Sequence, residues 1–210
     1  MRTSIKAAIL LFFITISTIN SKPKVDLYIE SLCPDCMQFL TTSYANFLKQ
    51  TDHMDLADVT IYPYGNASEK EQAGKYTFTC QHGPNECYGN LYYECANVFF
   101  GKKFGNTQRA HEFIVCMEGN IIVHGRNFDV AAYHCLLGDE DLLSMVQLCV
   151  QDPNVSYPLM HKVAQATDAL EPKHDHVPWI VVDGKWNLDV ENKIIADMYA
   201  YFKNTDKNIR

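Results

Sequence analysis

The chain has 210 residues, of which 47% are hydrophobic and 12% aromatic, and its formal net charge is −7. This composition is enough for a real apolar core in one large domain, or in a small domain with an insertion, and it excludes wholesale disorder. The acidic balance has no basic cluster to offset it, which argues against nucleic acids and anionic membranes as partners.

The first 21 residues are typical of a secretory signal peptide. Arg2 and Lys6 precede an apolar run over 7–16, and small or polar residues follow at 17–21. The run is shorter than the ~20 residues that a membrane helix needs, so we expect cleavage near Ser21, with an uncleaved anchor as the alternative. Cleavage changes the formal net charge from −7 to −9, and no later segment is long and apolar enough to span a bilayer.

The next elements have clear periodicities. Residues 25–30 alternate apolar with polar side chains, which predicts a strand. From Met37 to Leu48 the apolar residues recur at helical spacing, which predicts a helix. A second strand is expected over 59–64, where Pro63 limits it to an edge or an end.

The middle of the chain, residues 68–170, shows no clear strand and is predicted to be a helical block. Glycine and capping residues divide it. The second predicted helix is expected to end before Gly119, and the third before Gly138. Asp139 is expected to cap the fourth helix. Ser156 is expected to cap the fifth, which would have Pro158 in its first turn. The first four predicted helices span 86–100, 107–117, 128–137 and 142–150.

Strand signals return near the C-terminus, where Asp183-Gly184 is a strong hairpin turn signal between strands at 178–182 and 185–188, with a helix at 190–203. The outer segments therefore follow the order strand, helix, strand, then strand, turn, strand, helix. That order predicts an α/β chain with a thioredoxin-like fold and a disulfide-stapled helical insertion. The expected division is a signal peptide at 1–21, thioredoxin-like parts at 22–67 and 171–210, and the insertion at 68–170.

Cys33 and Cys36 form a CxxC pair between the first strand and the first helix. A helix N-terminus stabilises an anion and lowers the pKa of Cys33, whereas the carboxylate of Asp35 opposes this effect. We predict that Cys33 attacks a substrate disulfide and that Cys36, the less exposed thiol, resolves the mixed disulfide. The alternatives are a zinc half-site, for which no second CxxC is present, and an inert structural disulfide.

Val177-Pro178 lies just before the second strand pair, where thioredoxin-like folds place a cis-proline loop facing the CxxC. A cis bond there would leave the preceding backbone free to pair with an extended substrate, and an ordinary trans proline is the alternative. His174 and His176 precede this loop. Their charge in acid would favour the Cys33 thiolate if the loop faces it, and otherwise they are two solvated loop residues.

Eight cysteines after a signal peptide indicate an oxidising compartment and disulfide bonds. The six outside the CxxC allow 15 pairings, among which sequence alone does not choose. Cys87 and Cys95 would lie ~12 Å apart on one straight helix and could not pair. Two sequons predict N-glycosylation, at Asn66 and Asn154. The cysteines expected to form structural disulfides are Cys80, Cys87, Cys95, Cys116, Cys135 and Cys149.

The segment CQHGPNECYGNLYYEC, residues 80–95, fills every fixed position of the pattern C-Q-H-G-x-x-E-C-x-x-N-x-x-x-x-C. In this signature, and in the order of its other elements, the chain resembles the gamma-interferon-inducible lysosomal thiol reductase (GILT) family over about residues 25–203. The resemblance implies reduction of protein disulfides in acidic endosomes and lysosomes, with the CxxC carried over to Cys33 and Cys36. Vertebrate members have longer flanking segments, so lysosomal delivery and secretion both stay open. Within the signature, His82 is either a pH-sensing contact or a polar residue that stabilises the Gly83-Pro84 turn.

We therefore predict a thiol reductase that acts on disulfide-bonded proteins in the secretory pathway, in lysosomes or outside the cell. No metal, nucleotide or flavin motif is visible, so we expect electrons from an external thiol such as cysteine or glutathione. One alternative is a secreted disulfide oxidase or isomerase. The other is a secreted binding protein that keeps the fold without the activity.

Overall fold

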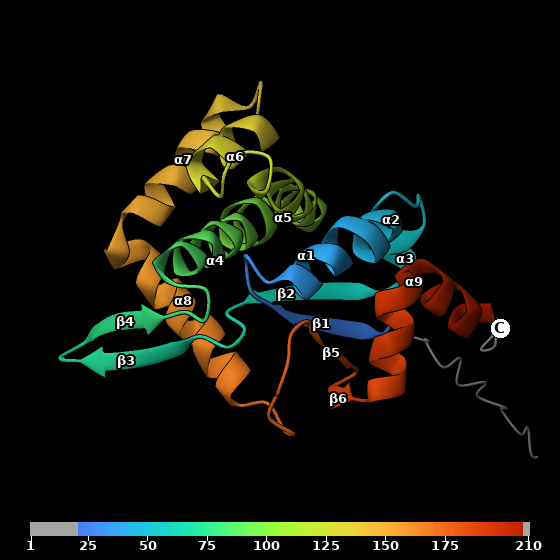
Figure 1. Ribbon diagram of the computed structural model, residues 1–210. Coiled ribbons are helices and arrows are strands. Elements are labelled where there is room, and N and C mark those ends of the chain that lie inside the picture. Colours follow the sequence, from blue (N-terminus) through green and yellow to red (C-terminus); the bar gives the residue numbers. More distant parts are fainter. Residues whose placement is uncertain (1–20, 208–210) are drawn as a thin grey trace, which may run out of the picture.

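The structure, a computed structural model, describes residues 21–207, so the predicted signal peptide lies outside the described residues except for Ser21. A four-stranded mixed sheet with the order β2-β1-β5-β6 forms its centre (Figure 1). β1 (Lys24–Ile29) runs parallel to β2 (Asp58–Pro63) and antiparallel to β5 (Trp179–Val182). β6 (Lys185–Trp186) completes the predicted hairpin. This sheet order and these directions are those of a thioredoxin-like fold, as predicted.

β1 is one of the two central strands and is covered on both faces. Val25, Leu27 and Ile29 are fully buried in the main core, whereas Tyr28 packs with Trp179 in a second cluster on the opposite face. Alternate side chains of a strand point to opposite faces, so each face of β1 contributes to a different core. This burial on both sides holds the end of β1, and therefore the CxxC that follows it, in one position.

The segment after the CxxC is one helical path with a change of pitch. It comprises α1 (Pro34–Phe39), the π-helical turn η1 (Leu40–Tyr44) and α2 (Ala45–Leu48), and the short α3 (His53–Leu56) follows. The C-terminal helix α9 (Leu188–Lys207) packs against η1 and α2 and is kinked at Asp197.

The kink in α9 has a specific partner on the first helical segment. The hydroxyl of Ser43 donates to the Ile194 carbonyl at 2.7 Å and accepts from the Met198 N–H at 2.8 Å. In a straight helix these two backbone groups would bond to each other. Ser43 therefore takes up both groups that the kink separates, and it ties α9 to η1.

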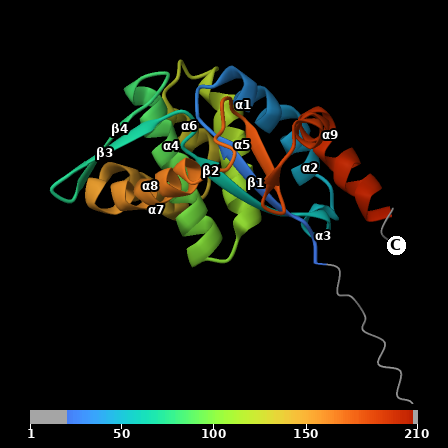
Figure 2. The ribbon, with the colours of Figure 1, turned by 90° about the horizontal axis from the view of Figure 1, so that it is seen from below.

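The helical block lies beside the β2 edge of the sheet, where α4 and α8 contact β2 (Figures 1 and 2). Asp139 occupies the N-cap position of the fourth predicted helix, as expected, but its side chain forms no capping hydrogen bond, and this helix begins at Glu140. Two boundaries were predicted wrongly. The second helix continues through Gly119, and the fifth begins at Pro153 because Asp152, rather than Ser156, caps it. The elements of the block are α4 (Pro84–Ala96), the π-helical η2 (Asn97–Lys103), α5 (Thr107–Ile121), α6 (Phe128–Cys135), α7 (Glu140–Gln151) and α8 (Pro153–Asp168).

The prediction that residues 68–170 lack strands was also wrong. β3 (Ser68–Gln72) and β4 (Lys75–Thr79) form an antiparallel hairpin that extends from the block (Figure 1). β3 is almost entirely polar, so it has no alternating pattern to detect. Tertiary contacts hold the hairpin instead, because Tyr76 stacks on His161 of α8 with ring centroids 4.1 Å apart, and Phe78 meets Tyr157 edge-on.

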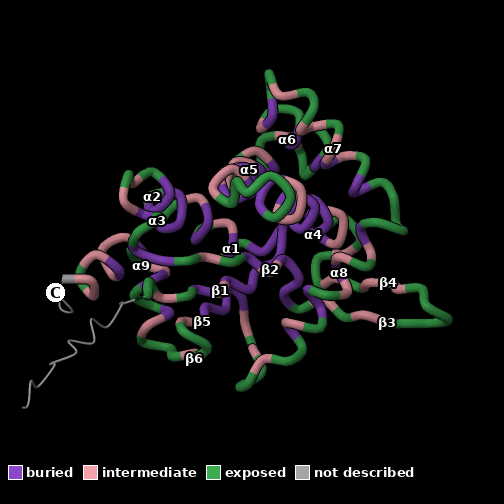
Figure 3. Tube along the Cα trace, turned by 180° about the vertical axis from the view of Figure 1, so that it is seen from behind, coloured by how far each residue is buried: buried purple, intermediate pink, exposed green. Residues whose placement is uncertain are grey.

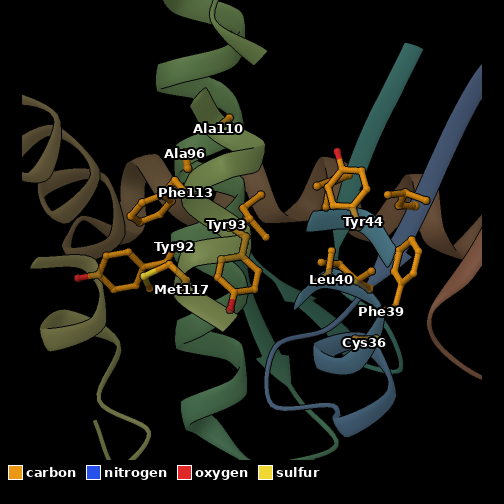
Figure 4. Close-up of a cluster of buried hydrophobic side chains, with 14 of the residues drawn as sticks. Cys36, Phe39, Leu40, Tyr44, Tyr92, Tyr93, Ala96, Ala110, Phe113 and Met117 are labelled. Carbon is orange, nitrogen blue, oxygen red and sulfur yellow. The ribbon is translucent and has the colours of Figure 1, made fainter. Parts of the chain in front are cut away.

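The block does not have a core of its own. One cluster of buried residues extends from the sheet into α4 and α5, with buried positions in each of these elements (Figure 3), and Figure 4 draws Cys36, Phe39 and Tyr44 in this cluster together with Tyr93 of α4. The insertion therefore forms one wall of the interior in which Cys36 is buried. No helix within residues 21–207 combines the length and apolar character that a membrane crossing requires.

Candidate functional site

The CxxC lies at the start of α1, after the turn that follows β1. β1 ends at Ile29, and Leu32 takes a left-handed backbone conformation (φ 65°) that turns the chain. Cys33 is the N-cap residue of α1, with extended backbone angles, and Pro34 occupies the first helical position, where its missing N–H leaves no hydrogen bond unmade. The Cys36 N–H donates to the Cys33 sulfur at 3.3 Å, so this sulfur takes the role that a serine or aspartate oxygen has in an ordinary helix cap.

The two thiols have different environments. Cys36 is fully buried and Cys33 is 6% exposed, which confirms the predicted order of exposure. The pKa of Cys33 is lowered from 9.0 to about 7, mainly because the Cys36 thiol hydrogen-bonds to it, and the backbone N–H groups of Cys36 and Asp35 add to this against the effect of burial. Burial raises the pKa of Cys36 well above its usual value. The lower pKa makes Cys33 the thiol that attacks first, and Cys36 must lose its proton before it can resolve a mixed disulfide.

The carboxylate that opposes the Cys33 thiolate is not the expected one. Asp35 acts on Cys33 through its backbone N–H, which lowers the pKa, whereas the charge of Glu30 raises it. Glu30 is the residue directly after β1 and is buried. Sequence reasoning missed Glu30 because it lies in the strand pattern and not in the CxxC itself.

The Val177-Pro178 loop faces the CxxC, as predicted, and the peptide bond between these residues is cis. The Cys33 thiol donates to the Val177 carbonyl at 3.8 Å. Glu191 of α9 holds the following strand, since its carboxylate accepts from the Ile180 N–H at 2.8 Å and from the Trp186 indole at 3.1 Å. A second cis bond, Glu171-Pro172, was not foreseen.

A groove of about 280 Å³ runs along this junction. One wall comes from α1 and η1, the second from the Val177-Pro178 loop, and the third from α9. Val177, whose carbonyl accepts from the Cys33 thiol, connects this groove to Cys33. Its lining includes Asp35, Phe39, Val177, Pro178, Leu188 and Ile195.

The two loop histidines do not act on Cys33 as the sequence suggested. His174 contacts the Gly65 carbonyl at 3.1 Å, and His176 lies between Asp175 at 2.6 Å and Glu191 at 2.8 Å. The main influences on the pKa of Cys33 come from Cys36, Asp35 and Glu30 instead. Both histidines therefore hold the loop in place.

The signature segment supports the turn that leads into the CxxC. Asn90 accepts from the Ser31 N–H at 2.8 Å, and the Ser31 hydroxyl donates to the Glu86 carbonyl at 2.9 Å. His82 contacts Glu86 at 2.8 Å and Glu30 at 3.5 Å. Apart from the local His82–Glu86 contact, these contacts join positions more than fifty residues apart, so spacing could not reveal them. They account for the fixed histidine, glutamate and asparagine of the signature.

The six other cysteines form three disulfides. Cys80–Cys87 closes the loop before α4, Cys95–Cys149 joins α4 to α7, and Cys116–Cys135 joins α5 to α6. This confirms that Cys87 and Cys95 do not pair with each other. Cys33 and Cys36 are the free cysteines of the described residues, and they belong to none of the potential metal-ligand groups found there.

The predicted glycosylation sites both lie at the surface. Asn66 is exposed, and its side chain donates to Gln81 at 2.7 Å. Asn154 is exposed in the first turn of α8, where its side chain donates to Asp152 at 3.0 Å. Both asparagines are accessible to a glycan, and their glycosylation stays a prediction.

Comparison with known proteins adds independent information. Residues 24–139 match the family model described as "Gamma interferon inducible lysosomal thiol reductase (GILT)". The chain is 36% identical over 184 residues to the gamma-interferon-inducible lysosomal thiol reductase of Carassius auratus, covering 86% of this chain and 67% of that protein. It is 32% identical to the Mus musculus protein of the same name, covering 88% of this chain and 69% of that protein.

Among solved structures, the oxidoreductase DsbA from Xylella fastidiosa aligns with a TM-score of 0.47 and 18% identity, over 91% of this chain and 89% of that one. The family assignment depends on the sequence matches, which cover the CxxC, the signature and most of the remaining chain. The chain belongs to the gamma-interferon-inducible lysosomal thiol reductase family.

Proposed function

We propose that this protein is a thiol reductase that reduces disulfide bonds of protein substrates, with Cys33 as the attacking thiolate and Cys36 as the resolving thiol. The observation that carries the proposal is the asymmetry of the pair. Cys33 caps α1, and its pKa is lowered to about 7, whereas Cys36 is fully buried one helical turn further on. Membership of a family whose curated members are named thiol reductases supports it.

The reaction balances as two exchanges. The Cys33 thiolate attacks one sulfur of the substrate disulfide, and the other substrate sulfur leaves as a thiolate and takes up a proton. Cys36 then loses its proton and attacks the Cys33 sulfur, which releases the second substrate thiol. The substrate gains two electrons and two protons, and the enzyme is left with a Cys33–Cys36 disulfide. Two molecules of an external thiol, such as cysteine or glutathione, return it to the dithiol.

The groove beside Cys33 supplies the place for the substrate chain. Val177 and Pro178 line it opposite α1, and the Val177 carbonyl already lies next to the Cys33 sulfur. An extended substrate segment laid along this loop would bring its disulfide to Cys33. We assign Val177 and Pro178 the role of orienting the substrate.

An acidic endosome or lysosome is the proposed workplace, with action after secretion as the alternative. With a pKa of about 7, about 1% of Cys33 is a thiolate at pH about 5, against roughly 0.01% for a thiol with the unshifted pKa of 9.0. The lowered pKa therefore raises the population of the nucleophile about a hundredfold at that pH.

The decisive experiment is the reduction of a denatured, disulfide-containing protein by the chain 22–210 at pH about 5 and about 7, with excess cysteine as reductant. We expect activity at both pH values, loss of activity in Cys33→Ser, and a trapped mixed disulfide in Cys36→Ser. Activity confined to neutral pH would keep the chemistry and exclude a lysosomal workplace. A lack of Cys33-dependent activity would favour the binding protein, and a strongly oxidising potential would favour the oxidase.

A further inference from the structure

Three side chains that can bind metals meet in front of the CxxC turn. Glu30 follows β1, His82 lies in the loop closed by the Cys80–Cys87 disulfide, and Glu86 belongs to the first turn of α4. One ligand atom from each lies within 4.8 Å of those of the other two. We call these residues the Glu30–His82–Glu86 cluster.

The charges in this cluster are not balanced by protein groups. Glu30 is 1% exposed and Glu86 is fully buried, and within residues 21–207 neither carboxylate forms an ion pair with lysine or arginine. His82 supplies at most one positive charge for two carboxylates. Buried carboxylates require a cation or a proton, so the cluster has room for one more positive charge.

One ligand atom in the cluster is unused. Glu86 Oε2 accepts from the His82 N–H at 2.5 Å and contacts His82 Nδ1 at 2.8 Å. The other oxygen, Oε1, is buried and has no hydrogen-bond partner among the described residues. Because the two oxygens share one carboxylate carbon, this unpartnered atom lies at the cluster. A buried carboxylate oxygen without a protein partner is free to accept a ligand at the cluster.

We propose that the Glu30–His82–Glu86 cluster is a binding site for a divalent transition-metal ion, with zinc as the ion that fits best. Zinc–ligand bonds of about 2.0–2.2 Å place tetrahedral ligand atoms about 3.4 Å apart. The distances from His82 Nδ1 to Glu86 Oε2 and to Glu30 Oε1, 2.8 and 3.5 Å, lie on either side of this separation. One imidazole nitrogen with two carboxylate oxygens suits zinc better than calcium or magnesium, which prefer oxygen ligands alone.

The surroundings of the cluster preorganise it and leave it open on one side. Glu30 Oε2 accepts from the Asn66 N–H at 2.7 Å, which orients that carboxylate, and the Ser31 hydroxyl donates to the Glu86 carbonyl. The His82 side chain is 30% exposed. An ion could therefore enter along His82 and keep a water molecule as its fourth ligand. No motif indicates this site, because Glu30 lies far from the signature along the chain.

The test uses the chain 22–210 with Cys33→Ser and Cys36→Ser, because free thiols bind zinc and the six other cysteines are in disulfides. Zinc chloride is titrated by calorimetry at neutral pH, and cobalt(II) is then added to read the visible absorption bands of a low-symmetry site. We expect one ion per chain and, in Glu86→Gln or His82→Gln, a loss of affinity of about a hundredfold or more. Glu86→Gln keeps an oxygen that can accept from the His82 N–H, so the helix start is retained.

Two controls make the result decisive. His134→Gln disrupts the stacked pair His124 and His134, whose ring centroids are 4.2 Å apart and which is the competing imidazole site. His161→Gln removes a histidine–carboxylate contact of the same kind at 2.8 Å, away from the cluster. Neither should change the affinity. The proposal is wrong if zinc does not bind, if binding survives both cluster variants, or if His134→Gln abolishes it. If Glu86→Gln fails to fold, the zinc affinity of His82→Gln tests the proposal, because His82 is partly exposed and its replacement disturbs the fold less. None of these readouts depends on reductase activity.

Discussion

The hydroxyl of Tyr93 donates a hydrogen bond of 2.9 Å to the carboxyl group of Glu118, deep in the interior that also holds Cys36 (Figure 4). The other oxygen of Glu118 has no hydrogen-bond partner within the described residues. Burial raises the pKa of Glu118 from 4.5 to about 8, and the charge of Glu118 in turn contributes to the raised pKa of Cys36. The redox pair thus lies near a carboxyl group that is neutral in acid.

This arrangement predicts how stability depends on pH. Because the folded pKa of Glu118 is raised, the folded state keeps a proton that the unfolded state releases above pH 4.5. The stabilisation is fully present below pH 4.5 and is lost as the pH rises towards 8. In the wild type, the free energy of unfolding should fall by on the order of 4 kcal/mol over this pH window. In Glu118→Gln the side chain stays neutral, so this fall should be absent. Urea unfolding at a series of pH values measures both.

Glu112→Gln on the same helix is the matched control for Glu118→Gln. Glu112 is only partly buried and accepts from Gln108 at 2.8 Å, so its replacement should leave the pH profile unchanged. If Glu118→Gln and wild type show parallel profiles between pH about 5 and 8, the carboxyl group is not protonated in the folded state.

A second prediction concerns the thiol pair. The Cys36 thiol is the largest single cause of the lowered pKa of Cys33, so Cys36→Ala should raise that pKa from about 7 towards 9.0. Cys36→Ser keeps a hydroxyl donor and should raise it less. The rate of alkylation of Cys33 by iodoacetamide as a function of pH measures both. An unchanged pKa in Cys36→Ala would assign the effect to the backbone N–H groups at the start of α1.

The close approach of α4 to the CxxC turn gives a third prediction. A Cβ atom on Gly89 would lie 2.2 Å from the Phe128 ring and 2.4 Å from the Ser31 hydroxyl. Gly89→Ala should therefore destabilise the fold by about 1–3 kcal/mol and shift Ser31, in spite of the higher helix propensity of alanine. Gly119→Ala, in α5, meets no atom within 4 Å and should stabilise by up to about 1 kcal/mol. Equal effects of the two substitutions in thermal unfolding would contradict the close packing.

The disulfides of the helical block supply a fourth prediction. Cys95 and Cys149 are 54 positions apart, and Cys116 and Cys135 are 19 apart. On loop entropy alone, replacing the first pair by alanine should cost about 4 kcal/mol and the second about 3 kcal/mol. Both are compared by denaturant unfolding in the Cys33→Ser/Cys36→Ser background, which prevents thiol exchange. A larger cost for the shorter loop would show that packing around Cys116 outweighs loop length.

Most of the outer fold could be predicted from the sequence, because its signals are local. The alternation in 25–30, the helical spacing after Cys36 and the Asp183-Gly184 turn each specify an element through near neighbours. The β3–β4 hairpin was missed because its stability comes from aromatic contacts with α8, which no window of residues contains. The start of α8 was misplaced because Asp152 and Ser156 are both good caps, and local preference does not choose between them.

The chemistry available to this protein follows from its amino-acid sequence alone. Two cysteines three positions apart at a helix start are enough for a redox pair, and the signature is enough to indicate the family. The groups that surround that pair, in contrast, depend on how the chain folds. The Val177 carbonyl and the buried Glu118 reach the CxxC from distant segments, and Glu30 acts on it from the turn that precedes Cys33. Their effect on the pKa values of Cys33 and Cys36 depends on how close they lie to the thiols and how deeply they are buried. Both depend on the packing of the insertion against the sheet.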